Sequence, residues 1–164
     1  SPPGRIEVDG EGRTKLTPAT TGPHRYLTVN EMQKTKTLEA LIAHRYEVMA
    51  GYAKDLRKAC ASELAANKAK QGDVSVLVAA KRWLHRDADK VPPAAAPQLA
   101  QARAAHPVLD KMVTMREELR QLWLNTSLSR EHLAKDLQAW CHRAESSGIT
   151  ALREFSFKLR AARA

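Results

Sequence analysis

The sequence predicts an all-α fold, a multi-helix bundle with one long N-terminal helix and a largely irregular N-terminal arm. Beyond residue 36, apolar residues recur every three or four positions, which is the spacing of helices with one buried face. Polar, proline and glycine breakers cut this pattern into helix-sized pieces, and no strong strand or hairpin pattern accompanies it. Aromatic residues are only 5% of the chain, so Leu, Ala, Val and Met are expected to build most of the core.

The first 36 residues have a different character. Eight of them are proline or glycine, and their apolar residues are isolated from one another. Ile6 and Val8 alternate with polar neighbours and could form a short extended piece. We therefore predict a flexible arm or linker over residues 1–36 and a helical domain over residues 37–164.

The first predicted helix is the longest. Thr37 can cap its beginning and Gly72 suits its end. At 1.5 Å per residue it would be about 50 Å long, with Gly51 as a weak point near its middle. One small domain cannot easily cover an apolar stripe of that length, so the helix predicts a homodimer or another protein partner.

Prolines and caps divide the middle of the chain. Asp73 is expected to cap a second helix, which Pro92–Pro93 ends. A short helix follows over Pro97–Ala105, and Pro107 suits the first position of the next helix because proline has no N–H to leave unpaired. The buried side of the second helix is predicted from Val74, Leu77, Val78, Trp83 and Leu84. That of the helix after Pro107 is predicted from Val108, Leu109, Met112, Met115, Leu119, Leu122 and Trp123.

Two more helices complete the prediction. Asn125, Thr126 and Ser127 interrupt the apolar pattern, and Ser127 or Ser129 caps the next helix. Its inward residues are Leu133, Leu137, Trp140, Cys141 and Ala144, and it ends at Ser146, Ser147 and Gly148. The last helix places Ile149, Leu152, Phe155 and Leu159 on one side.

The net charge of +9 is spread thinly along the chain and thickens only at the C-terminus. A diffuse surplus is more typical of solubility than of specific nucleic-acid binding. In the last helix, Arg153, Lys158, Arg160 and Arg163 face broadly away from the apolar side. They could contact nucleic-acid phosphates or an anionic membrane surface, although an ordinary solvated face is the favoured interpretation.

No catalytic or metal-binding set is recognisable, and neither a cofactor nor a small-molecule substrate is inferred. No two of the six histidines lie three or four residues apart, so no helix presents a pair of imidazoles to a metal. Cys141 and His142 are adjacent, which on a helix points their side chains about 100° apart. Glu117, Glu118, Glu131 and Asp136 have Arg or Lys nearby, which favours solvated ion pairs over a catalytic acid.

The two cysteines, Cys60 and Cys141, lie on predicted apolar faces and are interpreted as buried free thiols in a reducing compartment. No apolar run is long enough to cross a bilayer and no signal peptide is recognised. These features predict a cytoplasmic location, with attachment to a membrane only peripherally through a parent protein.

The three tryptophans could stack on nucleic-acid bases or fill the core. Trp83, Trp123 and Trp140 each fall in register with neighbouring leucines. Core packing is therefore the favoured interpretation.

Three segments carry a resemblance to known families: LEALIAHRYEVMAGYAKDLRKAC, KRWLHRDADKV and LQAWCHRAESSGITALREFSFKLR. They resemble the soluble C-terminal extension of proteobacterial fatty acid desaturases, from about Leu38 to Arg160. The same C-terminal pattern is similar to the helical region of an insertion-sequence transposase family. Desaturases of this kind use two irons held by histidine boxes, and such transposases use three acidic residues on a ribonuclease-H-like sheet. Neither set is found in this chain, so the resemblance assigns no catalytic residue.

The resemblance leads to two expectations for function. The first is a non-catalytic helical interaction or regulatory module, like the cytoplasmic tail of a desaturase. The alternative is a helical DNA-associated segment of a transposase-like protein. An independent enzyme is the weakest hypothesis, because the sequence offers no convergent set of polar groups.

Overall fold

A computed structural model describes residues 37–70, 73–125 and 127–161. The chain divides into two units, of which the second runs from His44 to Ala161. In the first unit, residues 37–43 are described and are helical. The predictions for residues 1–36, Gly72 and Arg163 lie outside the described residues, and the domain boundary at residue 36 stays a prediction.

The second unit is built from helices, and within the described ranges no residue is in a strand. This confirms the predicted all-α fold. The elements are α2 (Arg45–Ala69), α3 (Ser75–Trp83), the short 3-10 turns η1 (Ala88–Lys90) and η2 (Pro93–Ala95), α4 (Ala96–Ala105), α5 (Pro107–Leu124), α6 (Arg130–Glu145) and α7 (Thr150–Ala161).

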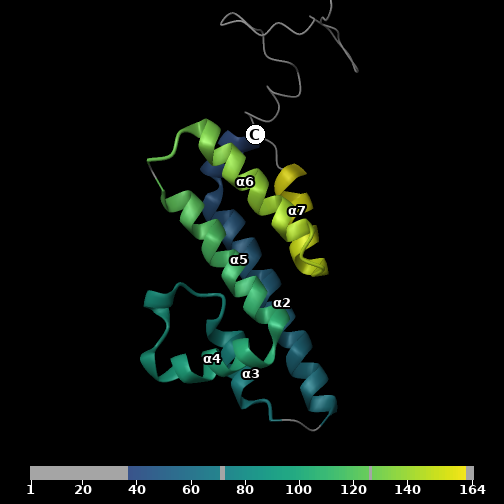
Figure 1. Ribbon diagram of the computed structural model, residues 1–164. Coiled ribbons are helices and arrows are strands. Elements are labelled where there is room, and N and C mark those ends of the chain that lie inside the picture. Colours follow the sequence, from purple (N-terminus) through teal and green to yellow (C-terminus); the bar gives the residue numbers. More distant parts are fainter. Residues whose placement is uncertain (1–36, 71–72, 126, 162–164) are drawn as a thin grey trace, which may run out of the picture. The chain divides into compact units, whose positions relative to one another are not determined.

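Helices α2 and α5 form the long axis of this unit (Figure 1). Helices α3 and α4 pack at the end where α2 finishes, and α6 and α7 pack along the end where α2 begins. The buried faces of α2 and α5 repeat at helical spacing, so each helix presents one continuous apolar stripe to the interior. These stripes consist of Tyr52, Leu56 and Cys60 on α2, and of Leu109, Met112, Met115 and Leu119 on α5.

The longest helix is shorter than the sequence predicts. His44 leaves the helical conformation, with φ −108° and ψ 25°, and α2 begins after it. The 25 residues of α2 span about 38 Å instead of about 50 Å.

Several predicted helix boundaries are confirmed. Pro107 is the first residue of α5. Ser129, rather than Ser127, caps α6, because its hydroxyl accepts a hydrogen bond from the backbone N–H of His132 at 3.1 Å. Asp73, by contrast, is not the N-cap predicted for the second helix. Val74 holds that position without a side-chain cap, and the Asp73 carboxylate accepts the backbone N–H of Ser75, the first residue of α3, at 3.0 Å. Gly148, between α6 and α7, has φ +79°, a backbone conformation that L side chains rarely adopt.

The second helix ends earlier than predicted, at Trp83 rather than near Pro92. The chain then turns so that the carboxylate of Asp87 reaches Arg116 and Arg120 of α5. This long-range ion pairing accompanies the 3-10 turns that replace the expected helix. Val78, predicted on the buried side, is 53% exposed.

Three aromatic rings meet edge to face in the core between α2, α6 and α7. Ring centroids lie 5.0 Å apart for Tyr52 and Phe155, 5.9 Å for Trp140 and Phe155, and 6.2 Å for Tyr52 and Trp140. Such pairs add about 0.5–1.5 kcal/mol each beyond the area that they bury. The cluster therefore fixes α6 and α7 against α2.

Candidate nucleic-acid interface

The basic side chains predicted on the last helix have different environments. Arg153 and Lys158 are exposed on α7 and have no ion pair with another described residue. Arg160 donates to both carboxylate oxygens of Glu145, at 2.5 and 3.3 Å, so its charge is largely neutralised within the protein. Arg163 lies outside the described residues. On α7, two cations therefore remain available to a ligand.

The apolar face of α7 is already in use. Leu152, Phe155 and Leu159 are buried in the protein, and Ser156 beside them donates to the Glu145 carboxylate at 2.5 Å. Helix α7 presents its polar face outward, together with Phe157, which is 52% exposed. An amphipathic helix that lies on a membrane inserts its apolar face, which is not free here.

A second group of basic side chains acts electrostatically on His85, in the turn after α3. We call it the basic cluster: Arg57 from α2, His85 and Arg86 from the turn, and Arg116 from α5. Burial lowers the pKa of His85, and the positive charges of these three arginines lower it further. Arg57 and Arg86 are exposed, so the cluster is open to solvent on one side.

One carboxylate partly balances this charge. Asp87 lies 2.7 Å from Nη2 of Arg116 and 3.2 Å from Nε of Arg120. The hydrogen bond from Arg116 is the main reason that the pKa of Asp87 is lowered. Arg116 is only 11% exposed, and its Nε is buried with no hydrogen-bond partner among the described residues. The cluster therefore keeps an excess of positive charge and an unused donor.

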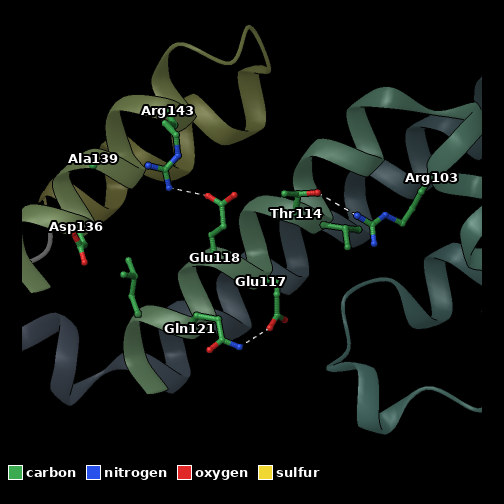
Figure 2. Close-up of a pocket in the computed structure, with 10 residues that line it drawn as sticks. Arg103, Thr114, Glu117, Glu118, Gln121, Asp136, Ala139 and Arg143 are labelled. Atoms are coloured by element: carbon green, nitrogen blue, oxygen red, sulfur yellow. Dashed lines mark hydrogen bonds and ion pairs between the residues drawn. The ribbon is translucent and has the colours of Figure 1, made fainter. Parts of the chain in front are cut away.

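A groove of about 550 Å³ lies between α5 and α6. Its lining includes the apolar side chains Val113, Leu122 and Ala139. Carboxylates mark its rim, where Glu118 bonds Arg143 at 2.8 Å and Glu117 accepts from Gln121 at 2.8 Å (Figure 2). Arg103 and Arg143 line the groove as well, so its charges are mixed around an apolar lining, which suits a polypeptide better than DNA.

The rim also includes three of the carboxylates considered as candidate acids in the sequence. Glu117 and Glu118 form ion pairs with Arg120 and Arg143, as expected for solvated pairs, and Asp136 lies opposite on α6. Within the described ranges, no three His, Cys, Asp or Glu side chains come together to hold a metal ion. No described helix is both long and apolar enough to cross a membrane.

The two cysteines and the tryptophans are placed as follows. Cys60 and Cys141 are buried free thiols, and burial raises the pKa of both, that of Cys60 to about 11. Trp140 is fully buried and donates its indole N–H to the carbonyl of Met115 at 2.9 Å. Trp83 and Trp123 are half-buried.

Comparison with known families gives one match. A sequence model of the ISL3 type of transposase matches residues 39–164, which is most of the chain. The chain belongs to this transposase family. No curated protein and no solved structure matches it. The transposase resemblance noted in the sequence is thus supported, and none of the comparisons supports the resemblance to desaturases.

What sequence reasoning missed is the basic cluster. Its members lie at positions 57, 85, 86 and 116, and only folding brings these segments together. The signal available in the sequence was arginines scattered over two helices and the turn after α3, which is also the pattern of an ordinary soluble protein.

Proposed function

We propose that this chain is a helical segment of a transposase that contacts the DNA backbone through its exposed cations. The family match over residues 39–164 carries the proposal, because transposases act on DNA. The surfaces proposed to contact DNA are the basic cluster and the exposed Arg153 and Lys158 of α7.

The charge of the second unit supports this proposal. Between His44 and Ala161 the sequence has 20 Lys and Arg residues against 13 Asp and Glu, a net +7. Several carboxylates already form ion pairs with arginines. The Lys and Arg side chains in excess of these pairs are therefore the charges that a polyanion would meet. Contacts of this kind bind phosphates without reading the base sequence.

Binding to a fluorescently labelled DNA duplex, followed by anisotropy over a series of salt concentrations, tests the proposal. We expect affinity to fall steeply as salt rises, because each phosphate contact contributes about 0.9 to the slope of log K against log salt. The double variant Arg57→Glu/Arg86→Glu should lower both the affinity and the slope, by roughly two contacts. Arg153→Glu/Lys158→Glu tests α7 in the same way.

Lys135→Glu is the matched control, because Lys135 is an exposed cation on α6 outside both surfaces. It should weaken binding less than either double variant. The proposal fails if the unmodified chain does not bind duplex DNA at low salt, or if all charge reversals weaken binding equally.

A second candidate function is docking of a protein partner, either another copy of the chain or a different protein. The α5–α6 groove favours it, since an apolar lining with a charged rim is typical of a polypeptide-binding surface. Ala139→Trp would fill the groove, and Ala134→Trp, at an exposed site of α6 that does not line it, is the control. If self-association measured by light scattering is unchanged by Ala139→Trp, a second copy does not occupy the groove.

A further inference from the structure

Helix α2 turns one face to solvent, and only Arg57 of this face belongs to a surface described above. Helices α3, α5 and α7 pack against α2, whose buried residues Tyr52, Leu56 and Cys60 lie on the side towards the core. With 3.6 residues per turn, the positions opposite that side recur every three or four residues. The exposed residues of this stripe form what we call the outer face of α2: Ala50, Lys54, Arg57, Lys58, Ala65 and Lys68.

The outer face carries positive charge without carboxylates. Over residues 50–69, all of which are described, the exposed side chains of α2 include four Lys or Arg and no Asp or Glu. The three carboxylates of the helix lie elsewhere. Glu47 precedes this range and lies 3.8 Å from His44, Asp55 is half-buried, and Glu63 lies 3.1 Å from Nδ1 of His106. The cations of the outer face are therefore not neutralised by acids of their own helix.

The exposed side of α6 has a different charge pattern. There the exposed cations Lys135 and Arg143 are accompanied by the exposed acids Glu131 and Asp136, and Arg143 pairs with Glu118 of α5. Mixed signs of this kind are usual on a solvated helix, because opposite charges three or four residues apart stabilise it. A face of one sign along the longest described helix instead suits a polyanion.

The side chains between the cations are small. Lys58 and Lys68 are ten residues apart, which is about 15 Å along the helix axis. The major groove of duplex DNA is about 12 Å wide and admits an α-helix. Cations at this spacing can therefore reach phosphates on the two sides of one groove, while the helix backbone between them comes close to the base edges. The exposed residues between the two lysines are Ser62, Ala65 and Ala66.

We propose that the outer face of α2 lies in the major groove of duplex DNA. Lys54, Arg57 and Lys58 contact phosphates on one side of the groove, and Lys68 contacts phosphates on the other. This inference rests on the proposed function and adds to it a further surface and the groove that this surface enters. Alanine and serine discriminate little between bases, so we expect this face to accept many sequences.

The first test uses the unmodified chain and two duplexes of the same sequence. In one duplex every cytosine carries a glucosylated hydroxymethyl group, which fills the major groove and leaves the phosphates unchanged. Fluorescence anisotropy should show weaker binding to this duplex. The slope of log K against log salt should also be smaller by about 3.6, because four phosphate contacts are lost. Equal affinity and equal slope on the two duplexes would overturn the proposal.

The second test removes cations of the outer face that belong to no other proposed surface. On the ordinary duplex, Lys54→Gln/Lys58→Gln should lower the slope by about 1.8 and Lys68→Gln by about 0.9. Lys135→Gln on α6 is the matched control and should keep the slope of the unmodified chain. If the Lys54→Gln/Lys58→Gln variant also keeps that slope, α2 is not the element in the groove and the proposal is wrong.

The third test changes size without changing charge. Ala65→Trp puts a bulky ring where the helix is proposed to approach the base edges, and Ala134→Trp puts the same ring at an exposed position of α6. Circular dichroism should show the same helix content for both variants. We expect Ala65→Trp to weaken binding to the ordinary duplex and Ala134→Trp to leave it unchanged. Equal affinity of the two variants would contradict the close approach of α2.

This proposal and the proposed function fail separately. If the ordinary duplex binds with a steep salt dependence but filling its major groove has no effect, the placement of α2 is wrong and the proposed function stands. If no duplex binds at low salt, the proposed function is wrong, and the placement of α2 is wrong with it.

Discussion

The hydroxyl of Tyr52 on α2 donates a hydrogen bond of 2.5 Å to the backbone carbonyl of Met112 on α5. Tyr52 is 1% exposed, and burial raises its pKa well above the ordinary value, so the phenol stays protonated and can always donate. This bond joins the two longest helices of the second unit at a point where water cannot replace it.

Tyr52→Phe removes this donor and leaves the ring in place. We expect the free energy of unfolding to fall by about 1–2 kcal/mol, because the net value of a buried hydrogen bond is of that order. Urea unfolding followed by circular dichroism measures the change. An unchanged unfolding midpoint would show that the hydroxyl does not contribute.

Trp140 and Trp123 should respond differently to replacement by Phe. Trp140→Phe loses a buried hydrogen bond to the Met115 carbonyl and ring volume in the aromatic cluster, for a cost of about 2 kcal/mol or more. In Trp123 the buried Nε1 has no acceptor among the described residues, so Trp123→Phe removes an unsatisfied donor. We expect it to cost less than about 1 kcal/mol. Equal destabilisation by the two changes, measured by urea unfolding, would contradict this.

The two glycines of the described helical unit predict changes of opposite sign. Gly148 has φ +79°, so Gly148→Ala should destabilise the protein by about 1 kcal/mol. Gly51 lies within α2, and an added Cβ would meet no atom within 4 Å. Gly51→Ala should therefore stabilise by about 0.5–1 kcal/mol. Thermal unfolding of both variants measures the two effects. A lower melting temperature for Gly51→Ala would show that the added methyl group does not fit at this position.

His85 should make folding sensitive to mild acid. Its pKa is lower in the folded chain than the 6.5 of an unperturbed histidine, so the unfolded state binds more protons near that pH. The resulting loss of stability grows as pH falls below about 6.5. Measured between pH 7.5 and 5.5 without DNA, the drop in unfolding free energy should be smaller in His85→Gln than in the unmodified chain. An identical drop would mean that the free imidazole is not perturbed.

Both thiols should be unreactive in the folded protein. Cys60 is 1% exposed and Cys141 is 3% exposed, and raised pKa values keep them as thiols rather than reactive thiolates. A thiol reagent that reports two cysteines in urea should report neither rapidly in buffer at pH 7.5. Fast labelling of Cys60 in buffer would indicate local opening between α2 and α3.

Local signals predicted the beginnings of α5 and α6 and the buried side of α6 well, but Val108, predicted on the buried side of α5, is 39% exposed. Pro107 and Ser129 act on the backbone within one turn of their own position, so their effect is readable without the rest of the fold. The five residues predicted to face inward on α6 are all buried, because the three-to-four spacing directly records which side meets the core.

The region after Trp83 could not be predicted in the same way. Its path depends on Asp87 meeting arginines 29 and 33 residues later, a contact that has no local pattern. The same is true of the basic cluster, where Arg57 and Arg116 are separated by more than half of the described unit. By contrast, Arg160 looked available in the sequence and is held by Glu145 across the α6–α7 turn. Tertiary ion pairing decides which cations remain accessible.

The anchors at Met112 and Met115 have a consequence for how this family can vary. Tyr52 and Trp140 both donate hydrogen bonds to main-chain carbonyl oxygens, which lie one turn apart on α5, and not to the methionine side chains. Every amino acid has a main-chain carbonyl oxygen, so other apolar residues of similar volume can replace the two methionines in relatives. The side-chain donors of Tyr52 and Trp140 cannot be replaced by just any residue. Relatives that lose either of them should therefore have another hydrogen-bond donor nearby.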